Sequence, residues 1–317
     1  MPGEQTQTFD SAGVALREMA LRRAELEDRT GAKASFGWYV RMDRHIAGVY
    51  GDAFAIAKRY QAELEARRRE GDEIGLHIHS IEKTDRGWRA NYADAALINE
   101  TIEEAVANFS ENFGFRCQAA RMGDMWSAAY CMEKFASLGV RYDLTLESGL
   151  RPRRISALYP GTKSLGVRPS MVSVPLTPFQ PELAGSAVAE DFWAIPLTSY
   201  RRRDFAHPGM WIVSVYSAVS TGFKRGHARD VFRPQAFYAP GMLRRAVETY
   251  IEECETPCIC VAIRNFGVPN RIHHFLDVLC EVAKDRPIRF VGPEGYVCMA
   301  AEKETGLEQA TRSATVR

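Results

Sequence analysis

The sequence predicts an α/β fold in which repeated β/α units build a parallel sheet or a barrel. Short apolar runs typical of strands alternate with longer amphipathic segments between about residue 32 and residue 300. Four such units follow one another in the first half, and no change of composition divides them. The 317 residues, 46% of them hydrophobic and 26% charged, suffice for one large α/β domain. We therefore expect a single domain over residues 1–303 and a flexible polar tail over residues 304–317.

The individual elements follow from hydrophobic periodicity and turn residues. An amphipathic helix is predicted over residues 13–29, and the run ASFGWYV over residues 34–40 predicts a strand. A charged helix over residues 50–70 ends at a glycine, and EIGLHIH over residues 73–79 predicts the next strand. Residues 149–189 are rich in Pro, Gly and Ser, and we expect them to form one wall of a site. The remaining predictions are helices over residues 93–113, 127–138, 241–253 and 270–284, and strands over residues 116–120, 141–146, 192–197, 209–216, 258–264 and 287–291.

Charge and apolar patterning exclude several classes of function. The chain has 41 Lys and Arg against 40 Asp and Glu, so its net charge of +1 provides no overall field for nucleic acid or an anionic membrane. The first residues lack a basic stretch followed by an apolar run, and no run of about 18 apolar residues could span a bilayer. We expect a cytoplasmic protein with no nucleic-acid and no membrane partner, and homo-oligomerisation stays open.

The seven cysteines are scattered among apolar residues, which suits a reducing compartment. Cys254, Cys258 and Cys260 could be ligands of a soft metal. Two of them lie in the apolar run PCICVAI, however, for which a buried strand is the simpler interpretation. Functional residues are therefore expected elsewhere.

Polar residues follow the predicted strands at their carboxyl ends, where β/α folds assemble their active sites. The strongest signal is His77-Ile78-His79, because side chains two apart on a strand point the same way and two imidazoles can hold one metal ion. Asp43 could add an oxygen ligand, which would give the ligand set of catalytic zinc and non-haem iron sites. The alternative is a surface or hydrogen-bonded histidine pair. The other candidates at strand ends are Arg41, Arg121, Asp124, Glu147, Thr198, Tyr200, Arg264 and Asn265.

Four stretches resemble motifs of the polysaccharide deacetylases, the NodB-homology proteins of carbohydrate esterase family four. GDEIGLHIHS over residues 71–80 resembles the motif G-x-E-I-G-x-H with a following histidine. ASFGWYVRMD over residues 34–43 is similar to a strand of the family, and QAARMGDMW over residues 118–126 resembles its arginine motif. LGVRYDLTLESG over residues 138–149 resembles the continuation L-G-x-x-Y-D. The order and spacing of the motifs match over about residues 13–300, and the resemblance implies a distorted, incomplete TIM-like (β/α)7 barrel.

The resemblance also implies roles for individual residues. It makes His77 and His79 ligands of a divalent metal ion, expected to be Zn²⁺, and it makes Arg121 the residue that orients a catalytic carboxylate. One departure concerns the second histidine, which in the family lies four residues after the first, where this chain has Ile81.

Further departures concern the carboxylates. The family's paired aspartates are reduced to Asp10, so that either Asp43 or Asp10 is the carboxylate ligand. Asp124 or Asp10 would be the base that takes the proton of water, although Asp124 could equally be a simple helix N-terminal residue. Arg264 stands where the family's late catalytic histidine is expected.

Together these features predict a metal-dependent hydrolase that removes an acetyl group from an N-acetylated sugar or a related amide. The metal would polarise the carbonyl and lower the pKa of bound water. Trp126, Arg264, Glu147 and Arg41 are the expected substrate-binding residues, and Arg264 would either bind a carboxylate or phosphate or form a structural ion pair. Two alternatives stay open: another metal-dependent reaction on the same barrel, or a metal-free carbohydrate-binding relative.

Overall fold

A parallel sheet forms the centre of the protein. The structure, a computed structural model, describes residues 10–155, 163–183, 191–201, 231–232, 240–253, 258–261 and 269–301. The five strands of the sheet are β1 (Gly37–Val40), β2 (Glu73–Ile78), β5 (Ala119–Met122), β6 (Tyr142–Asp143) and β9 (Trp193–Ala194). They lie side by side in chain order, and every pair is parallel. The predicted α/β fold with a parallel sheet is confirmed, and within the described residues the strands do not close into a barrel.

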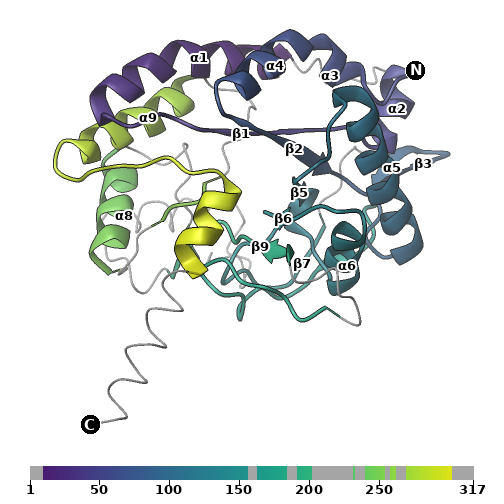
Figure 1. The fold of residues 1–317 in the computed structure, drawn as a ribbon. Helices are drawn as coiled ribbons and strands as arrows, with labels where there is room; N and C mark the ends of the chain where they lie inside the picture. The colour runs from purple at the N-terminus through teal and green to yellow at the C-terminus, as the bar shows by residue number, and fades with distance from the viewer. Residues whose placement is uncertain are drawn as a thin grey trace.

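Helices surround the sheet (Figure 1). They are α1 (Asp10–Thr30), α2 (Arg44–Tyr50), α3 (Ala55–Arg59), α4 (Gln61–Arg69), α5 (Ala95–Phe113), α6 (Ala129–Ser137), α8 (Pro240–Glu253), α9 (Pro269–Ala283) and a last helix over residues 293–301. Helix α5 begins where the side chain of Asp94 accepts the Leu97 N–H, and it ends at Gly114, whose φ of 69° is left-handed. Among the described helices, none combines the length and apolar character that crossing a membrane requires.

The two faces of strands β2 and β5 have different environments. Leu76 and Ile78 of β2 lie in the core under α5 and α6, together with Met122 of β5. Burial of each such side chain stabilises the fold by about 1.5–3 kcal/mol. Because side chains alternate along a strand, His77 and Arg121 point to the opposite face, and they are direct neighbours in the register of the two strands. The core therefore fixes the direction of the polar residues.

Two segments from the last part of the chain, near residues 258–261 and 287–291, pack beside the two edges of the sheet. The Thr198 N–H donates to the Cys260 carbonyl at 2.9 Å, beside β9. At the other edge, the rings of Phe36 and Phe290 lie 6.5 Å apart. The last helix places Tyr296 in a cluster with residues of β5, β6 and β9. Extended segments near residues 258–261 and 287–291 thus border the sheet without forming ladder pairs with it.

Several sequence predictions need correction. The helix predicted over residues 50–70 is broken into α3 and α4, because the backbone turns at Gly51, which is left-handed, and again at Tyr60. Residues 287–291 form no strand, nor do residues 258–261 of the predicted run at 258–264. The predicted strand at 209–216 lies outside the described residues.

Three short hairpins or strand pairs were not predicted. Strands β3 (Ile81–Thr84) and β4 (Gly87–Ala90) form a hairpin directly after His79. Strands β7 (Arg153–Arg154) and β8 (Val167–Arg168) pair within the region that was expected to be a wall of the site. Strands β10 (Tyr200–Arg201) and β11 (Val231–Phe232) form a further antiparallel pair. Their short lengths explain why no periodic pattern marked them.

Candidate functional site

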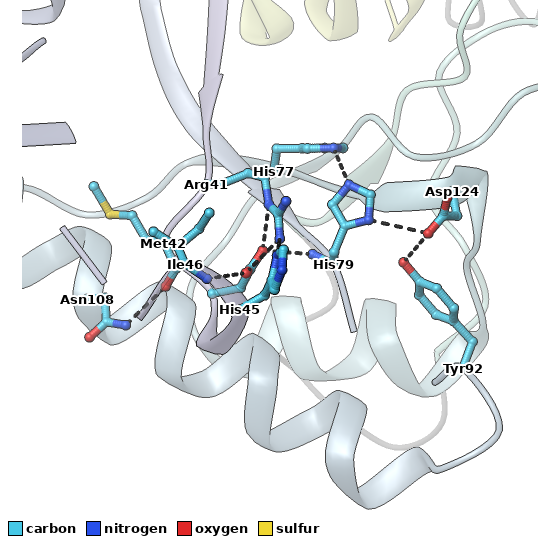
Figure 2. Close-up of polar contacts among 10 residues, drawn as sticks. Arg41, Met42, His45, Ile46, His77, His79, Tyr92, Asn108 and Asp124 are labelled. Carbon is cyan, nitrogen blue, oxygen red and sulfur yellow. Dashed lines mark hydrogen bonds and ion pairs between the residues drawn. The ribbon is translucent and has the colours of Figure 1, made fainter. Parts of the chain in front are cut away.

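The carboxyl ends of β1, β2 and β5 bring together most of the polar residues singled out in the sequence. His77 lies near the end of β2 and His79 directly follows that strand, while Asp43 follows β1 and Asp124 follows β5. Figure 2 shows His77, His79 and Asp124 lying toward one another. The carboxyl ends of parallel strands lie at the same edge of a sheet, so residues that follow different strands meet there. We call the expectation that functional residues follow strand ends the strand-end rule.

A chain of polar contacts runs through the site. His77 Nε2 and His79 Nε2 are 2.9 Å apart, and the two rings stand nearly perpendicular at 86°. His79 Nδ1 lies 3.3 Å from Asp124 Oδ2, and the Tyr92 hydroxyl donates to the same oxygen at 3.0 Å. We call these four residues, His77, His79, Asp124 and Tyr92, the histidine cluster. The structure thus places both predicted histidines and Asp124 in one network, and it adds Tyr92.

The contacts fix the proton positions of His79. A carboxylate accepts hydrogen bonds only, so Asp124 holds the proton of His79 on Nδ1. The lone pair of His79 Nε2 then faces His77, whose Nε2 donates in this arrangement. A histidine held in this tautomer by a carboxylate is the arrangement usual for a metal-ligating or proton-transferring imidazole.

The backbone beside Asp124 is unusual. Asp124 and Met125 have φ values of 54° and 55°, in the left-handed region that few side chains favour. The preceding Gly123 lies against the His79 ring, and a Cβ built on it would be 2.3 Å from ring atoms. Only glycine permits this approach, because such a separation is far below van der Waals contact. The turn after β5 therefore sets the position of both Asp124 and His79.

Asp43 has a different environment. Its carboxylate is fully buried and accepts from Arg41 Nε at 2.9 Å and Arg41 Nη2 at 2.8 Å. It also caps α2 by accepting the Ile46 N–H and binds the His79 backbone N–H at 3.1 Å. Burial alone would raise the pKa of Asp43, but the charge and hydrogen bonds of Arg41 bring it below its ordinary value.

The prediction of Asp43 as a third metal ligand is therefore not supported, because both of its oxygens already have donors. Within the described ranges, no three or more His, Cys, Asp and Glu side chains are grouped so that they could hold a metal ion. The two imidazoles could supply two of the ligands: Zn–N bonds of about 2.0–2.1 Å at a tetrahedral angle put two ligand nitrogens about 3.4 Å apart. The Nε2 atoms are 2.9 Å apart, so a small separation of the rings would suffice.

Arg41 and His45 form a second layer beneath the site. Arg41 is 13% exposed and binds Asp43, and its Nη2 lies 3.2 Å from His45 Nδ1. Burial, followed by the charge of Arg41, lowers the pKa of His45 to about 4, so that this imidazole is neutral at pH 7. Arg41 thus has a structural contact with Asp43, and its predicted part in substrate binding stays a prediction. Sequence reasoning did not single out His45.

Arg121 lies beside His77 in the register of β2 and β5. Its charge acts on the buried carboxylate of Asp143. Burial raises the pKa of Asp143 to about 6, while hydrogen bonds from Thr145 and the charge of Arg121 act in the opposite direction. Asp143 was missed, although it is the Asp of the Y-D pair in the stretch at 138–149 that resembles the deacetylases. The predicted role of Arg121 in orienting a catalytic carboxylate stays a prediction.

The remaining candidates lie in different places. Trp126 is 5% exposed and donates from Nε1 to the Val167 carbonyl at 3.2 Å, so it supports the site and presents no free face to a sugar. Glu147 is buried and forms an isolated bridge with Leu197. Asp10 is the first residue of α1, and its side chain lies outside the described part, as does the whole of Arg264.

Comparisons with known proteins give no match by sequence. No family model matches the chain, and no curated protein matches it. Among solved structures, a candidate polysaccharide deacetylase from Mycobacterium smegmatis is similar with a TM-score of 0.48 at 13% identity, covering 95% of this chain and 83% of that chain. Puue allantoinase has a TM-score of 0.46 at 15% identity, with 89% and 72% covered. A GH57 branching enzyme from Thermococcus kodakaraensis, solved with glucose, has 0.38 at 12% identity, with 92% and 58% covered. Similarity at this level establishes neither a family nor an activity for this chain.

Proposed function

We propose that the chain is a hydrolase that removes an acetyl group from an N-acetylated sugar or a related amide at the histidine cluster. The observation that supports this most directly is the contact chain from His77 through His79 to Asp124. It lies at the carboxyl ends of neighbouring parallel strands, where substrates bind in such folds. The side chains of His79 and Asp124 are 16% and 25% exposed, which leaves them accessible to a substrate and water.

Residues of the chain would transfer the protons and hold the catalytic carboxylate in place. Asp124 would take a proton from the attacking water and return it to the nitrogen that leaves, which balances the protons of amide hydrolysis. Tyr92, whose hydroxyl donates to Asp124, would hold this carboxylate in place. Burial raises the pKa of Tyr92 well above its ordinary value, so that the hydroxyl stays protonated.

His77 and His79 would hold a divalent metal ion, expected to be Zn²⁺, through their Nε2 atoms, for which His77 would carry its proton on Nδ1 in place of Nε2. When bound, the metal would polarise the amide carbonyl and lower the pKa of water. The hydrogen bond between His79 Nδ1 and Asp124 supports this assignment, because it keeps the lone pair on the Nε2 atom that a metal would need.

Release of acetate tests the proposed function. Purified wild-type protein, loaded with Zn²⁺, would be incubated with N-acetylglucosamine, its oligomers and simple acetamides, and acetate would be measured. We expect release by the wild type and a loss of at least 100-fold in His79→Ala. His273→Ala, which alters a partly exposed histidine on α9, is the control and should keep full activity. Binding of a sugar without any release of acetate would favour the non-catalytic relative, and zinc-dependent turnover of other substrates would favour a different reaction.

A further inference from the structure

A side chain continues the hydrogen bonding between β5 and β6 at the edge of the sheet that carries the histidine cluster. The last pair in the register of the two strands is Ala120 with Asp143. Beyond this pair, the Leu144 N–H donates to the Ala120 carbonyl at 2.9 Å. One more ladder bond would direct the Met122 N–H to the Leu144 carbonyl. That N–H donates instead to the Thr145 hydroxyl at 2.8 Å.

The Thr145 hydroxyl is oriented so that its oxygen can accept this bond. Its single proton goes to Asp143 Oδ1, which also accepts the Thr145 backbone N–H at 2.9 Å. Met122, Asp143 and Thr145 are all fully buried, so a polar group that lost its partner here would have no water to replace it. Thr145 therefore joins the carboxylate at the end of β6 to the carboxyl end of β5.

The bond to Thr145 lies directly before the unusual turn that carries Asp124. The left-handed φ values of Asp124 and Met125 are costly and persist only where surrounding contacts determine the backbone. After the turn, such a contact comes from Trp126, whose indole N–H donates to the Val167 carbonyl at 3.2 Å. Before the turn, the contact toward β6 is the Thr145 hydroxyl. The turn is thus held on both sides.

We infer that Thr145 is a positioning residue for Asp124. By holding the Met122 N–H it fixes the point at which the turn begins, and so the approach of the Asp124 carboxylate to His79 Nδ1, 3.3 Å away. Without the hydroxyl, the end of β5 is free to move away from β6, and a misplacement of about 1 Å can lower a rate about 100-fold. The chemical role of Asp124 rests on the proposed function, whereas the position of its carboxylate does not.

Three variants test the positioning. Thr145→Val keeps the shape of the side chain and removes both hydrogen bonds of the hydroxyl, whereas Thr145→Ser retains them. Thr101→Val is the matched control, because Thr101 is equally buried and its hydroxyl donates to the Leu97 carbonyl within α5. If circular dichroism shows that Thr145→Val does not fold, Thr145→Cys takes its place, since a thiol is only a weak donor and acceptor.

The ring nitrogens of His79 report the position of Asp124 without any turnover. Long-range ¹H–¹⁵N spectra of full-length, chelator-treated protein labelled at histidine distinguish the two tautomers of a neutral imidazole, and His79→Gln assigns the signals. We expect His79 to carry its proton on Nδ1 in the wild type, Thr145→Ser and Thr101→Val. In Thr145→Val the Nδ1 and Nε2 signals should shift toward each other, because a displaced carboxylate no longer selects one tautomer.

Turnover provides a second readout. If the wild type releases acetate, Thr145→Val should lower kcat about 10-fold and leave KM within about twofold, because the substrate still binds while the carboxylate is misplaced. Thr145→Ser and Thr101→Val should keep kcat within about threefold of the wild type.

The two readouts separate this inference from the proposed function. Shifted His79 signals in Thr145→Val alone would support the positioning even if no protein released acetate, and only the hydrolase would then be rejected. Unchanged His79 signals in Thr145→Val, equal shifts in Thr101→Val, or a failure of Thr145→Ser to restore the wild-type signals would overturn the inference. An active Thr145→Val protein with an unchanged kcat would overturn it as well.

Discussion

Two aspartates at the carboxyl ends of parallel strands, Asp43 after β1 and Asp124 after β5, have opposite surroundings. Asp43 is fully buried, and an arginine and two backbone N–H groups bind its oxygens. Asp124 is a quarter exposed and is bound by a histidine and a tyrosine. Arginine and backbone donors hold a carboxylate permanently ionised, whereas histidine can exchange a proton with it. A position at the end of a strand therefore marks a residue as a candidate for the site. The groups that bind its side chain then indicate whether its role is structural or chemical.

The largest effect expected from this comparison is on stability. Asp43→Ala would leave Arg41 buried without its partner and would remove the cap of α2, so we expect a loss of about 3–5 kcal/mol in the free energy of unfolding. Urea denaturation followed by circular dichroism measures this loss. A change below about 1 kcal/mol would show that Asp43 is not the structural carboxylate.

The pH dependence of stability extends the comparison to a third carboxylate. Asp143 is as buried as Asp43 but is bound by Thr145 in place of an arginine, and its pKa rises from 3.8 to about 6. The folded state then binds the proton more tightly than the unfolded chain. The contribution of Asp143 is therefore greatest below about pH 4 and falls by up to about 3 kcal/mol as the pH rises to about 6.

Asp143→Asn should remove this fall, which urea denaturation between pH 4 and pH 7 would reveal as a flatter profile than in the wild type. Asp43 acts in the opposite sense, because its lowered pKa makes its contribution disappear as the pH falls. Identical slopes for wild type and Asp143→Asn would contradict the assignment.

Asp124→Asn should act on activity and leave stability nearly unchanged. Asparagine cannot take a proton from water, so we expect kcat/KM to fall about 100-fold, equivalent to about 2.7 kcal/mol. The free energy of unfolding should change by less than about 1 kcal/mol, because the side chain is partly exposed. The reverse pattern, a variant destabilised by several kcal/mol that keeps full activity when folded, would exchange the roles of Asp124 and Asp43.

A smaller effect is expected from Gly123→Ala. The added methyl group would displace the His79 ring from its contact with Asp124, and we expect kcat/KM to fall about 10- to 100-fold. Gly114→Ala is the control, because Gly114 has a left-handed φ but no neighbour within 4 Å of its added Cβ. It should lower stability by about 1 kcal/mol without altering turnover. Equal activity losses in the two variants would contradict the positioning role of Gly123.

The sequence was informative where one local rule decided the geometry. Period-two alternation put His77 and His79 on one face, and the strand-end rule brought Asp124 to them. The strand-end rule did not predict the surroundings of Asp43. The bidentate pair that Asp43 forms with Arg41, two residues earlier, depends on how the chain turns after β1. Tyr92 was missed because an unpredicted hairpin separates it from His79. The compartment, the oligomeric state and the identity of the metal stay predictions.

The most direct test of the account is the metal content of four proteins after incubation with Zn²⁺ and removal of excess metal, measured by plasma mass spectrometry. The proteins are the wild type, His77→Ala, His79→Ala and Asp43→Asn, each compared per mole of folded protein by circular dichroism. The account predicts close to one zinc ion in the wild type and in folded Asp43→Asn, and none in either histidine variant. A metal-free wild type, or a folded Asp43→Asn protein that has lost its zinc, would contradict it.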